Sequence, residues 1–291
     1  MKYKICAVIV SYNPGQIIKD CVESVLKQVD KLLIIDNASR KPTLKILFDL
    51  QKKSKKIEII RNKNNFGIAN ALNIAANYAI KYNYDWLLTL DQDSKLSPVM
   101  IETMLNLYRV LPEKAQNRVA ILAPNYKTIK GFAYRQKVRS KIIPAAITSG
   151  QLVKKSTFKK IGLYKDNLFI ECVDNDFCLR AKKKGLFTLL VIEAMLYQRI
   201  GDNPVLKNFL GKKFVLTNHS PVRYYYIYRN SVYLYKKYFT SSFGWVLNNI
   251  GSNIKLFIKL IFYEDKKISK ILMLLLGIFH GLINHYGKFE E

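Results

Sequence analysis

The sequence predicts an α/β fold, with a mainly parallel, doubly wound sheet followed by a helical extension at the C-terminus. Short runs of β-branched and aliphatic residues alternate with longer segments of helical period between residues 4 and 124. This alternation is typical of βαβ units. From about residue 218 the composition becomes aromatic, basic and helical. We therefore divide the chain into a domain over residues 1–217, with parts at 1–124 and 125–217, and a helical region over 218–291.

Five strands are predicted in the first part of the domain. They cover residues 5–12, 31–36, 56–62, 85–91 and 119–124, with helical stripes at 17–26 and 68–79. Polar loops follow four of the strands, at residues 11–14, 36–39, 62–67 and 91–94. Because open α/β sheets bind ligands outside the carboxyl ends of their strands, we expect these loops to line one crevice.

The second part of the domain is less regular. Residues 125–150 are basic and aromatic with weak periodicity, which predicts a flexible insertion that leads to a strand ending at residues 148–150. A helix is expected after residue 173, with Gly185 as its C-terminal stop. A further strand is expected at residues 187–192.

Composition and charge restrict the possible functions. With 291 residues, 49% of them hydrophobic, the chain can bury a sizeable core, so disorder is excluded. The formal net charge of +27 predicts attraction to a nucleic acid, an anionic membrane or a phosphorylated substrate. Four cysteines without metal-ligand spacing predict reduced thiols in a cytosolic protein. No run reaches the roughly 18 apolar residues of a membrane span.

An acidic pair follows the fourth predicted strand. Asp91 and Asp93 are two residues apart, so on an extended segment both side chains project to the same side. They can face one cation, or one diphosphate with its metal ion, at the ligand-binding edge of the sheet. A solvated loop after a strand would give the same local pattern.

Two other loops carry polar residues suited to a nucleotide. Asp36 and Asn37, with Ser11 and Tyr12, could recognise a pyrimidine base, although the first two residues could equally cap a turn. Asn65 opens a helix whose N–H groups suit an anion, or it is an ordinary cap. The sequence contains no GxxxxGK[ST] and no GxGxxG motif, which argues against a P-loop NTPase and a dinucleotide dehydrogenase.

A second acidic group lies later in the chain. Asp174 and Asp176 begin a predicted helix near Glu171, and one of them could be a general base. Alternatively, Asp174 is the N-cap and Asp176 interacts with the helix dipole. In the basic and aromatic segment that follows His219, arginines could bind phosphate or lie at an interface.

The helical region has two amphipathic stretches, at residues 245–261 and 268–282. Such helices can lie in a membrane interface and be attracted by anionic lipid. They can also pack on the preceding domain or on a second subunit. The sequence leaves these alternatives open.

Taken together, several motifs resemble family 2 glycosyltransferases, specifically the bacterial rhamnosyltransferase branch. The matching segments are residues 10–14, 35–39, 65–73, 90–94, 148–150, 169–180 and 223–230. The resemblance implies a Rossmann-like GT-A fold and an inverting mechanism. It also implies a dTDP-L-rhamnose donor, a cell-surface polysaccharide acceptor, and Mg²⁺ or Mn²⁺ as cofactor.

Carried over by position, the resemblance implies roles for particular residues. Asp174 would be the catalytic base, and Asp93, with Asp91 and His219, would be a metal ligand. The family often has a metal-binding His where this chain has Gln198. Donor binding is expected from Ser11, Tyr12, Asn13, Asp36, Asn37, Asn65, Gly67, Asn70, Asp91 and Gln92. Acceptor or phosphate binding is expected from Ser149, Gly150, Glu171, Asp176, Arg223 and Arg229.

We therefore expect a cytoplasmic enzyme, peripheral on the inner face of the plasma membrane, that transfers L-rhamnose to a lipid-linked acceptor. A homodimer is possible from the amphipathic helices. An enzyme of the same fold with a UDP-hexose donor is the alternative, because thymine and uracil present the same hydrogen-bonding edge. A non-enzymatic nucleic-acid-binding protein is a distant third interpretation, which the charge permits.

Overall fold

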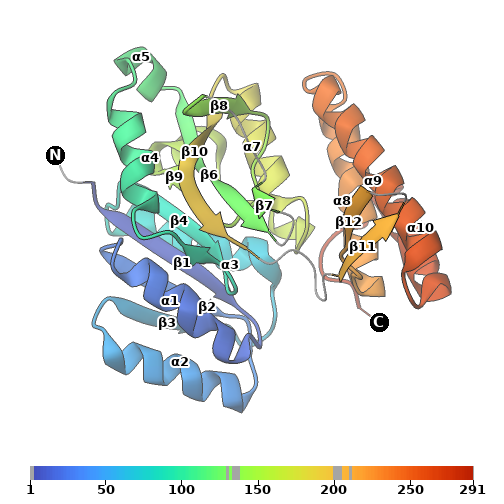
Figure 1. Cartoon of the computed structure of the whole chain (residues 1–291), viewed down its shortest axis with the longest axis horizontal. Helices are drawn as coiled ribbons and strands as arrows, with labels where there is room; N and C mark the ends of the chain where they lie inside the picture. The colour runs from blue at the N-terminus through green and yellow to red at the C-terminus, as the bar shows by residue number, and fades with distance from the viewer. Residues whose placement is uncertain (1–2, 129–130, 133–137, 199–204, 210–211, 291) are drawn as a thin grey trace.

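A computed structural model describes residues 3–128, 131–132, 138–198, 205–209 and 212–290 of the chain. Its centre is a ten-stranded sheet with the strand order β3-β2-β1-β4-β9-β6-β10-β5, with β7 and β8 pairing at the side of this path. Helices cover the sheet, and the last three helices stand together beside it (Figure 1). The predicted α/β fold with a helical C-terminal extension is confirmed.

The first four main strands form a parallel half-sheet. They are β1 (Ile5–Ser11), β2 (Lys31–Asp36), β3 (Ile57–Arg61) and β4 (Trp86–Asp91). Side chains alternate between the two faces, so Ala7 and Ile9 enter one hydrophobic cluster while Cys6 and Val8 enter the other. The helices here are α1 (Ile18–Leu26), after the short η1 (Gly15–Ile17), α2 (Lys41–Lys53) and α3 (Gly67–Lys81).

The other half of the sheet is mixed. β9 (Gln151–Lys154) runs antiparallel to both of its neighbours, β4 and β6 (Val119–Thr128), and β6 pairs in parallel with β10 (Phe187–Tyr197). The short strands β5 (Lys95–Leu96), β7 (Gly131–Phe132) and β8 (Ser140–Ile143) add antiparallel pairs. The accompanying helices are α4 (Met100–Arg109), α5 (Glu113–Gln116), α6 (Lys155–Ile161), η2 (Asp166–Leu168) and α7 (Val173–Lys183).

The prediction of a strand ending at residues 148–150 is wrong. These residues form a bend and a turn, and the strand begins after them, at Gln151. Gly150 explains the turn, since its φ of +83° lies in the left-handed region and any Cβ would overlap the side chain of Pro124. The expected insertion over residues 125–150 lies partly outside the described residues, and its described parts include the end of β6, with β7 and β8.

The C-terminal region begins after a hairpin of β11 (Val205–Phe209) and β12 (Lys212–Leu216). It consists of α8 (Pro221–Tyr238), α9 (Phe243–Tyr263) and α10 (Lys267–Leu282). Gly277 and Gly281 bring α10 against α8, because a Cβ at either position would overlap the carbonyl of Tyr225 or Arg229. Among the described residues, no helix combines the length and apolar character needed to cross a membrane.

Candidate active site

A cleft of about 720 Å³ lies at the carboxyl ends of the parallel strands, bordered also by α7, α8 and α9. Of the residues predicted to form a site, the following line it: Tyr12, Asn37, Asn65, Gly67, Asp91, Gln92, Asp93, Glu171, Asp174, His219 and Arg223. The two acidic groups, which lie about eighty residues apart in the sequence, therefore border a single cavity, as expected.

The first acidic group is fixed at the end of β4. The amide Nε2 of Gln198, which follows β10, donates to Asp91 Oδ2 at 2.7 Å. Burial, and then the charge of Asp93, raise the pKa of Asp91 to about 7, although the Gln198 bond acts in the opposite direction. Gln92 turns back toward β1 and accepts from the Tyr12 N–H at 2.8 Å. The sequence analysis singled out Gln198 but did not predict its hydrogen bond to Asp91.

The second acidic group lies in the first turn of α7. Asp174 Oδ2 accepts from the Thr148 N–H at 2.9 Å, and Oδ1 accepts from the Asn175 N–H at 2.7 Å. Burial raises the pKa of Asp174 to about 6, with the Glu171 charge adding to the effect. The N-cap of α7 is Cys172, so the alternative reading of Asp174 as an N-cap is wrong.

The loop before α7 has an unusual backbone. Phe169, Glu171 and Cys172 all have φ between 60° and 64°, in the left-handed region that side chains rarely adopt. Asn230 of α8 holds this loop, because its Nδ2 atom donates to the carbonyls of Leu168, Ile170 and Glu171. These contacts keep Glu171 and Asp174 at the cleft, and no local sequence signal indicates them.

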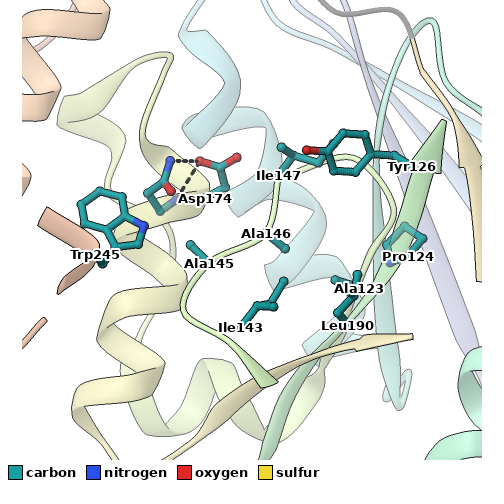
Figure 2. A pocket seen from close by; sticks show the side chains of 11 residues that line it. Ala123, Pro124, Tyr126, Ile143, Ala145, Ala146, Ile147, Asp174, Leu190 and Trp245 are labelled. Atoms are coloured by element: carbon teal, nitrogen blue, oxygen red, sulfur yellow. Dashed lines mark hydrogen bonds between the residues drawn. The ribbon is translucent and has the colours of Figure 1, made fainter. Parts of the chain in front are cut away.

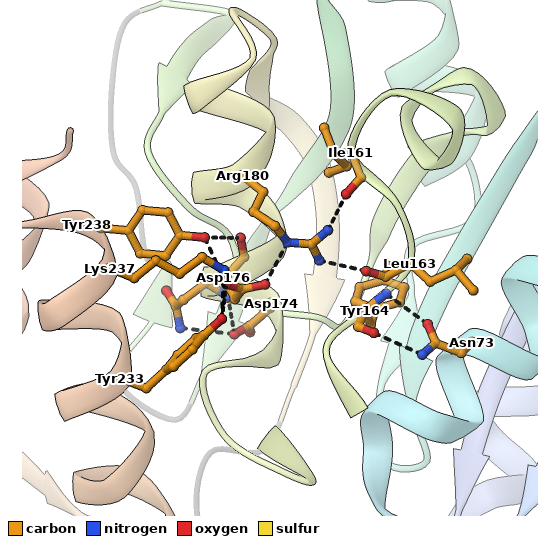
Figure 3. Close-up of polar contacts among 11 residues, drawn as sticks. Asn73, Ile161, Leu163, Tyr164, Asp174, Asp176, Arg180, Tyr233, Lys237 and Tyr238 are labelled. Atoms are coloured by element: carbon orange, nitrogen blue, oxygen red, sulfur yellow. Dashed lines mark hydrogen bonds and ion pairs between the residues drawn. The ribbon is translucent and has the colours of Figure 1, made fainter. Parts of the chain in front are cut away.

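Asp176 and Arg229 do not face the cleft, so their predicted roles in acceptor or phosphate binding are wrong. Asp176 is fully buried and contacts Arg180 at 2.7 Å, Lys237 at 2.8 Å and the Tyr238 hydroxyl at 2.8 Å (Figure 3). Arg229 is also fully buried and donates to the carbonyls of Gly287 and Leu168. Both side chains connect the C-terminal helices to the sheet domain.

The predicted anion site at the start of α3 is wrong as well. The Gly67 N–H donates to Asn65 Oδ1 at 2.9 Å, and the Ile68 N–H donates to the Phe169 carbonyl at 2.7 Å. The first N–H groups of the helix are therefore already bonded. Gly67 is required for this contact, because a Cβ would overlap the Phe169 carbonyl. Asn70 lies in the same helix and does not line the cleft.

Five further predicted residues do not line the cleft. Ser149 is buried, and its Oγ accepts from the Asp91 N–H at 3.1 Å, while Asp36 is buried and accepts from the Ser39 N–H. The side chain of Asn13 accepts from the Arg40 N–H at 2.9 Å. These five residues are Ser11, Asn13, Asp36, Ser149 and Gly150. Their predicted direct contacts with substrate are not supported.

Of the three predicted metal ligands, Asp91 and Asp93 are suited to a divalent cation, whereas His219 is not grouped with them. Two carboxylates at one edge repel each other, which is one cause of the raised Asp91 pKa, and a hard cation with oxygen ligands would relieve this repulsion. Within the described part of the chain, no three His, Cys, Asp or Glu side chains are grouped so that they could hold a metal ion. His219 therefore does not complete a three-ligand site with this pair.

Comparison with solved structures identifies the fold. The mannosyltransferase PcManGT from Pyrobaculum calidifontis, in complex with GDP-Man and Mn²⁺, aligns with a TM-score of 0.61 at 10% identity over 98% of this chain and 88% of its own. S. aureus TarS 1–349 in complex with UDP-GlcNAc aligns with a TM-score of 0.54 at 14% identity over 99% of this chain and 94% of its own. The fold is that of a GT-A glycosyltransferase.

Sequence comparison gives the family. The family model described as glycosyl transferase family 2 matches residues 6–162, which is more than half of the chain. The chain therefore belongs to glycosyl transferase family 2. It is similar to the dTDP-rhamnosyl transferase RfbF of Shigella flexneri, with 28% identity over 254 residues that cover 81% of each chain.

Proposed function

We propose that this glycosyltransferase transfers L-rhamnose from dTDP-L-rhamnose, with inversion, to a lipid-linked precursor of a cell-surface polysaccharide. The observation that carries the proposal is the cleft that Asp91 and Asp93 share with Asp174. The similarity to a dTDP-rhamnosyl transferase over 81% of both chains supports the choice of donor. In this arrangement Tyr12 and Asn37, which line the same cleft, contact the nucleotide.

Asp174 is the proposed base. An acceptor hydroxyl oxygen attacks the anomeric carbon of the donor, and its proton passes to the Asp174 carboxylate. The bond between that carbon and the diphosphate oxygen breaks, and dTDP leaves with the electron pair. A pKa of about 6 suits this role, because the group is mostly ionised at pH 7 and is more basic than an ordinary aspartate.

Asp91 and Asp93 are the residues that would hold Mg²⁺ or Mn²⁺ near the donor diphosphate. A bound cation supplies positive charge that stabilises the departing diphosphate. Gln198 orients Asp91 through its hydrogen bond and, being neutral, adds no charge to this group. Arg223 pairs with Glu171 at 2.6 Å at the same cleft and is a candidate to contact phosphate.

A UDP-hexose donor is the second candidate, supported by the structural similarity to TarS in complex with UDP-GlcNAc. The test is a hydrolysis and transfer screen of dTDP-L-rhamnose beside UDP- and GDP-sugars, with Mn²⁺, with Mg²⁺ and with a chelator. We expect turnover of dTDP-L-rhamnose that falls when the cation is removed. Preferred turnover of a UDP-sugar would select the second candidate, and inactivity toward every nucleotide sugar would refute both.

We also propose that α9 and α10 bind the anionic inner face of the plasma membrane. Both helices expose large apolar side chains: Phe243, Leu247, Ile254, Ile258 and Phe262 on α9, and Ile268, Leu272, Leu275, Phe279 and Leu282 on α10. On each helix these residues recur at intervals of three, four or seven, so they form an apolar patch along one face, and such patches mark interaction sites. The basic chain, with Lys266 and Lys267 exposed at the start of α10, complements anionic lipid.

Vesicle sedimentation tests this attachment. We expect binding to vesicles that contain phosphatidylglycerol, weaker binding to phosphatidylcholine alone, and a loss of binding in Leu272→Ser/Leu275→Ser. Equal sedimentation of the variant would refute the assignment. A dimer that the same variant dissociates, without any vesicle binding, would assign the patch to a second copy. Steep salt-dependent binding to an oligonucleotide in preference to vesicles would favour the nucleic-acid alternative.

A further inference from the structure

A second, smaller cavity adjoins the cleft at Asp174. Its volume is about 150 Å³, and Ile147, Asp174 and Asn175 line both this pocket and the cleft. In Figure 2, Trp245 and Tyr126 flank the pocket on opposite sides of the view, with Asp174 between them. The proposed base therefore lies where the two cavities meet.

The pocket is amphipathic, with a polar part at Asp174 and Asn175 beside apolar side chains. Apart from Asp174 and Asn175, its walls are aliphatic, aromatic or proline side chains from β6, β8, β10, α9 and the segment after β8. A hydroxyl can find a partner at Asp174 or Asn175, but it would be unfavourable against the apolar side chains. A volume of about 150 Å³ is enough for a group about the size of benzene. The pocket thus suits a small apolar group attached to a polar molecule that remains in the cleft.

Trp245 forms one wall and comes from the C-terminal helical region. It is partly exposed and packs beside the cluster of Leu179, Tyr238 and Val246, which fixes α9 against α7. A tryptophan ring offers a large, rigid apolar surface with low entropy cost on binding. α9 therefore contributes directly to the pocket beside the proposed base.

We propose that this pocket binds the acceptor sugar, and that it selects a pyranose that carries a methyl group. The methyl group would lie among Ala145, Ile143 and Trp245 while a ring hydroxyl faces Asp174. This inference rests on the proposed glycosyl transfer. Two kinds of sugar supply such a methyl group: a 6-deoxyhexose, on its ring, and a 2-acetamido sugar, on its acetyl group.

Intrinsic fluorescence gives a direct binding test, because the chain has only two tryptophans and Trp86 is buried with 1% exposure. Methyl α-L-rhamnoside, N-acetylglucosamine and glucose are titrated separately into the protein with dTDP and Mn²⁺ present. We expect a saturable change with one or both methyl-bearing sugars and none with glucose. The change should disappear in Trp245→Phe, where only Trp86 emits.

Variants then separate acceptor binding from donor chemistry. Trp245→Ala should raise the acceptor KM by about tenfold or more, and Trp245→Phe should restore most of the loss. Ala145→Leu fills the pocket and should have the same effect without removing the aromatic ring. Phe48→Ala removes an exposed aromatic side chain on α2 as a matched control and should leave the acceptor KM unchanged.

Hydrolysis of the donor in the absence of acceptor distinguishes a failure of the proposed glycosyl transfer from a failure of the pocket assignment. If no nucleotide sugar is hydrolysed, the proposed function fails. If hydrolysis proceeds but Trp245→Ala and Ala145→Leu leave the acceptor KM unchanged, the assignment of the pocket fails alone. An equal fluorescence response to glucose, or no response to any of the three sugars, would also overturn it.

Discussion

Asp174 and Asp176 lie only two residues apart on α7, but the pKa of the first is raised and the pKa of the second is lowered. On the cleft side, burial raises the pKa of Asp174 to about 6, and the charge of Glu171 acts in the same direction. On the inner side, burial also acts to raise the pKa of Asp176, but the charges of Arg180 and Lys237 outweigh it and hold the pKa below its usual value.

The difference teaches that burial alone does not make an acid reactive. Asp176 has two cations and a tyrosine hydroxyl as partners, so its charge is stabilised and it connects α7 to α8. Asp174 has hydrogen bonds from Thr148 and Asn175 but no ion pair among the described contacts. Charged partners decide which acid is structural and which can exchange a proton near neutral pH.

The strongest test of the comparison is Asp174→Asn. The amide oxygen can still accept from the Thr148 N–H, but the side chain can no longer take a proton. We expect glycosyl transfer to fall by about 10²–10⁴-fold with little change in thermal unfolding. Asp265→Asn, an exposed acid between α9 and α10, is the matched control and should retain activity. Substantial transfer by Asp174→Asn would refute the base assignment.

Asp176→Ala should act on stability instead. It leaves Arg180, whose side chain is 13% exposed, and the less buried Lys237 without their shared carboxylate. We expect the free energy of unfolding to fall by about 3 kcal/mol in urea titrations. Asp20→Ala removes an exposed acid from the first turn of α1 and should cost at most about 1 kcal/mol. Equal losses in the two variants would contradict the contrast.

Asp91 should make stability depend on pH. Its pKa is about 7 in the folded chain against an ordinary value of 3.8, so between these values the folded state holds a proton that the unfolded state has lost. The free energy of unfolding therefore falls as pH rises through this window. Asp91→Asn removes the effect, and in a chelator we expect it to be more stable than wild type by about 1–2 kcal/mol at pH 8.

At pH 4 the advantage of Asp91→Asn should nearly vanish, because Asp91 is then protonated in the folded wild-type chain. Thermal unfolding of both proteins at the two pH values measures the difference. A stability gain that is equal at pH 4 and pH 8 would show that the carboxylate charge is not its cause.

Gln198→Leu should give the smallest effect. The variant removes the amide donor that lowers the Asp91 pKa, so that pKa should rise and less Asp91 should be ionised at pH 6. We expect the acidic limb of the kcat/KM profile for the donor to move to higher pH, with near-normal rates above pH 8. A uniform loss at every pH would indicate a different role for Gln198.

Prediction from sequence succeeded where the signal was local. The strand at residues 31–36 was predicted at its observed bounds, and those at 5–12 and 85–91 each to within one residue, because hydrophobic runs and turn residues lie within the same short window. The pair of Asp91 and Asp93 was found for the same reason. The strand predicted to end at residues 148–150 in fact begins at Gln151. The sequence did not distinguish the two possibilities, because a polar turn can either follow or precede a strand.

The sequence by itself therefore determined the alternation of strands and helices, the carboxyl edge of the parallel strands, and the acids that reach it. Only the tertiary structure decided that Asp176 pairs with Lys237, that Gln198 reaches Asp91, and that Trp245 closes a pocket at Asp174. Secondary structure follows from side chains a few residues apart, whereas the charge state and exposure of an acid depend on groups that folding brings from distant parts of the chain.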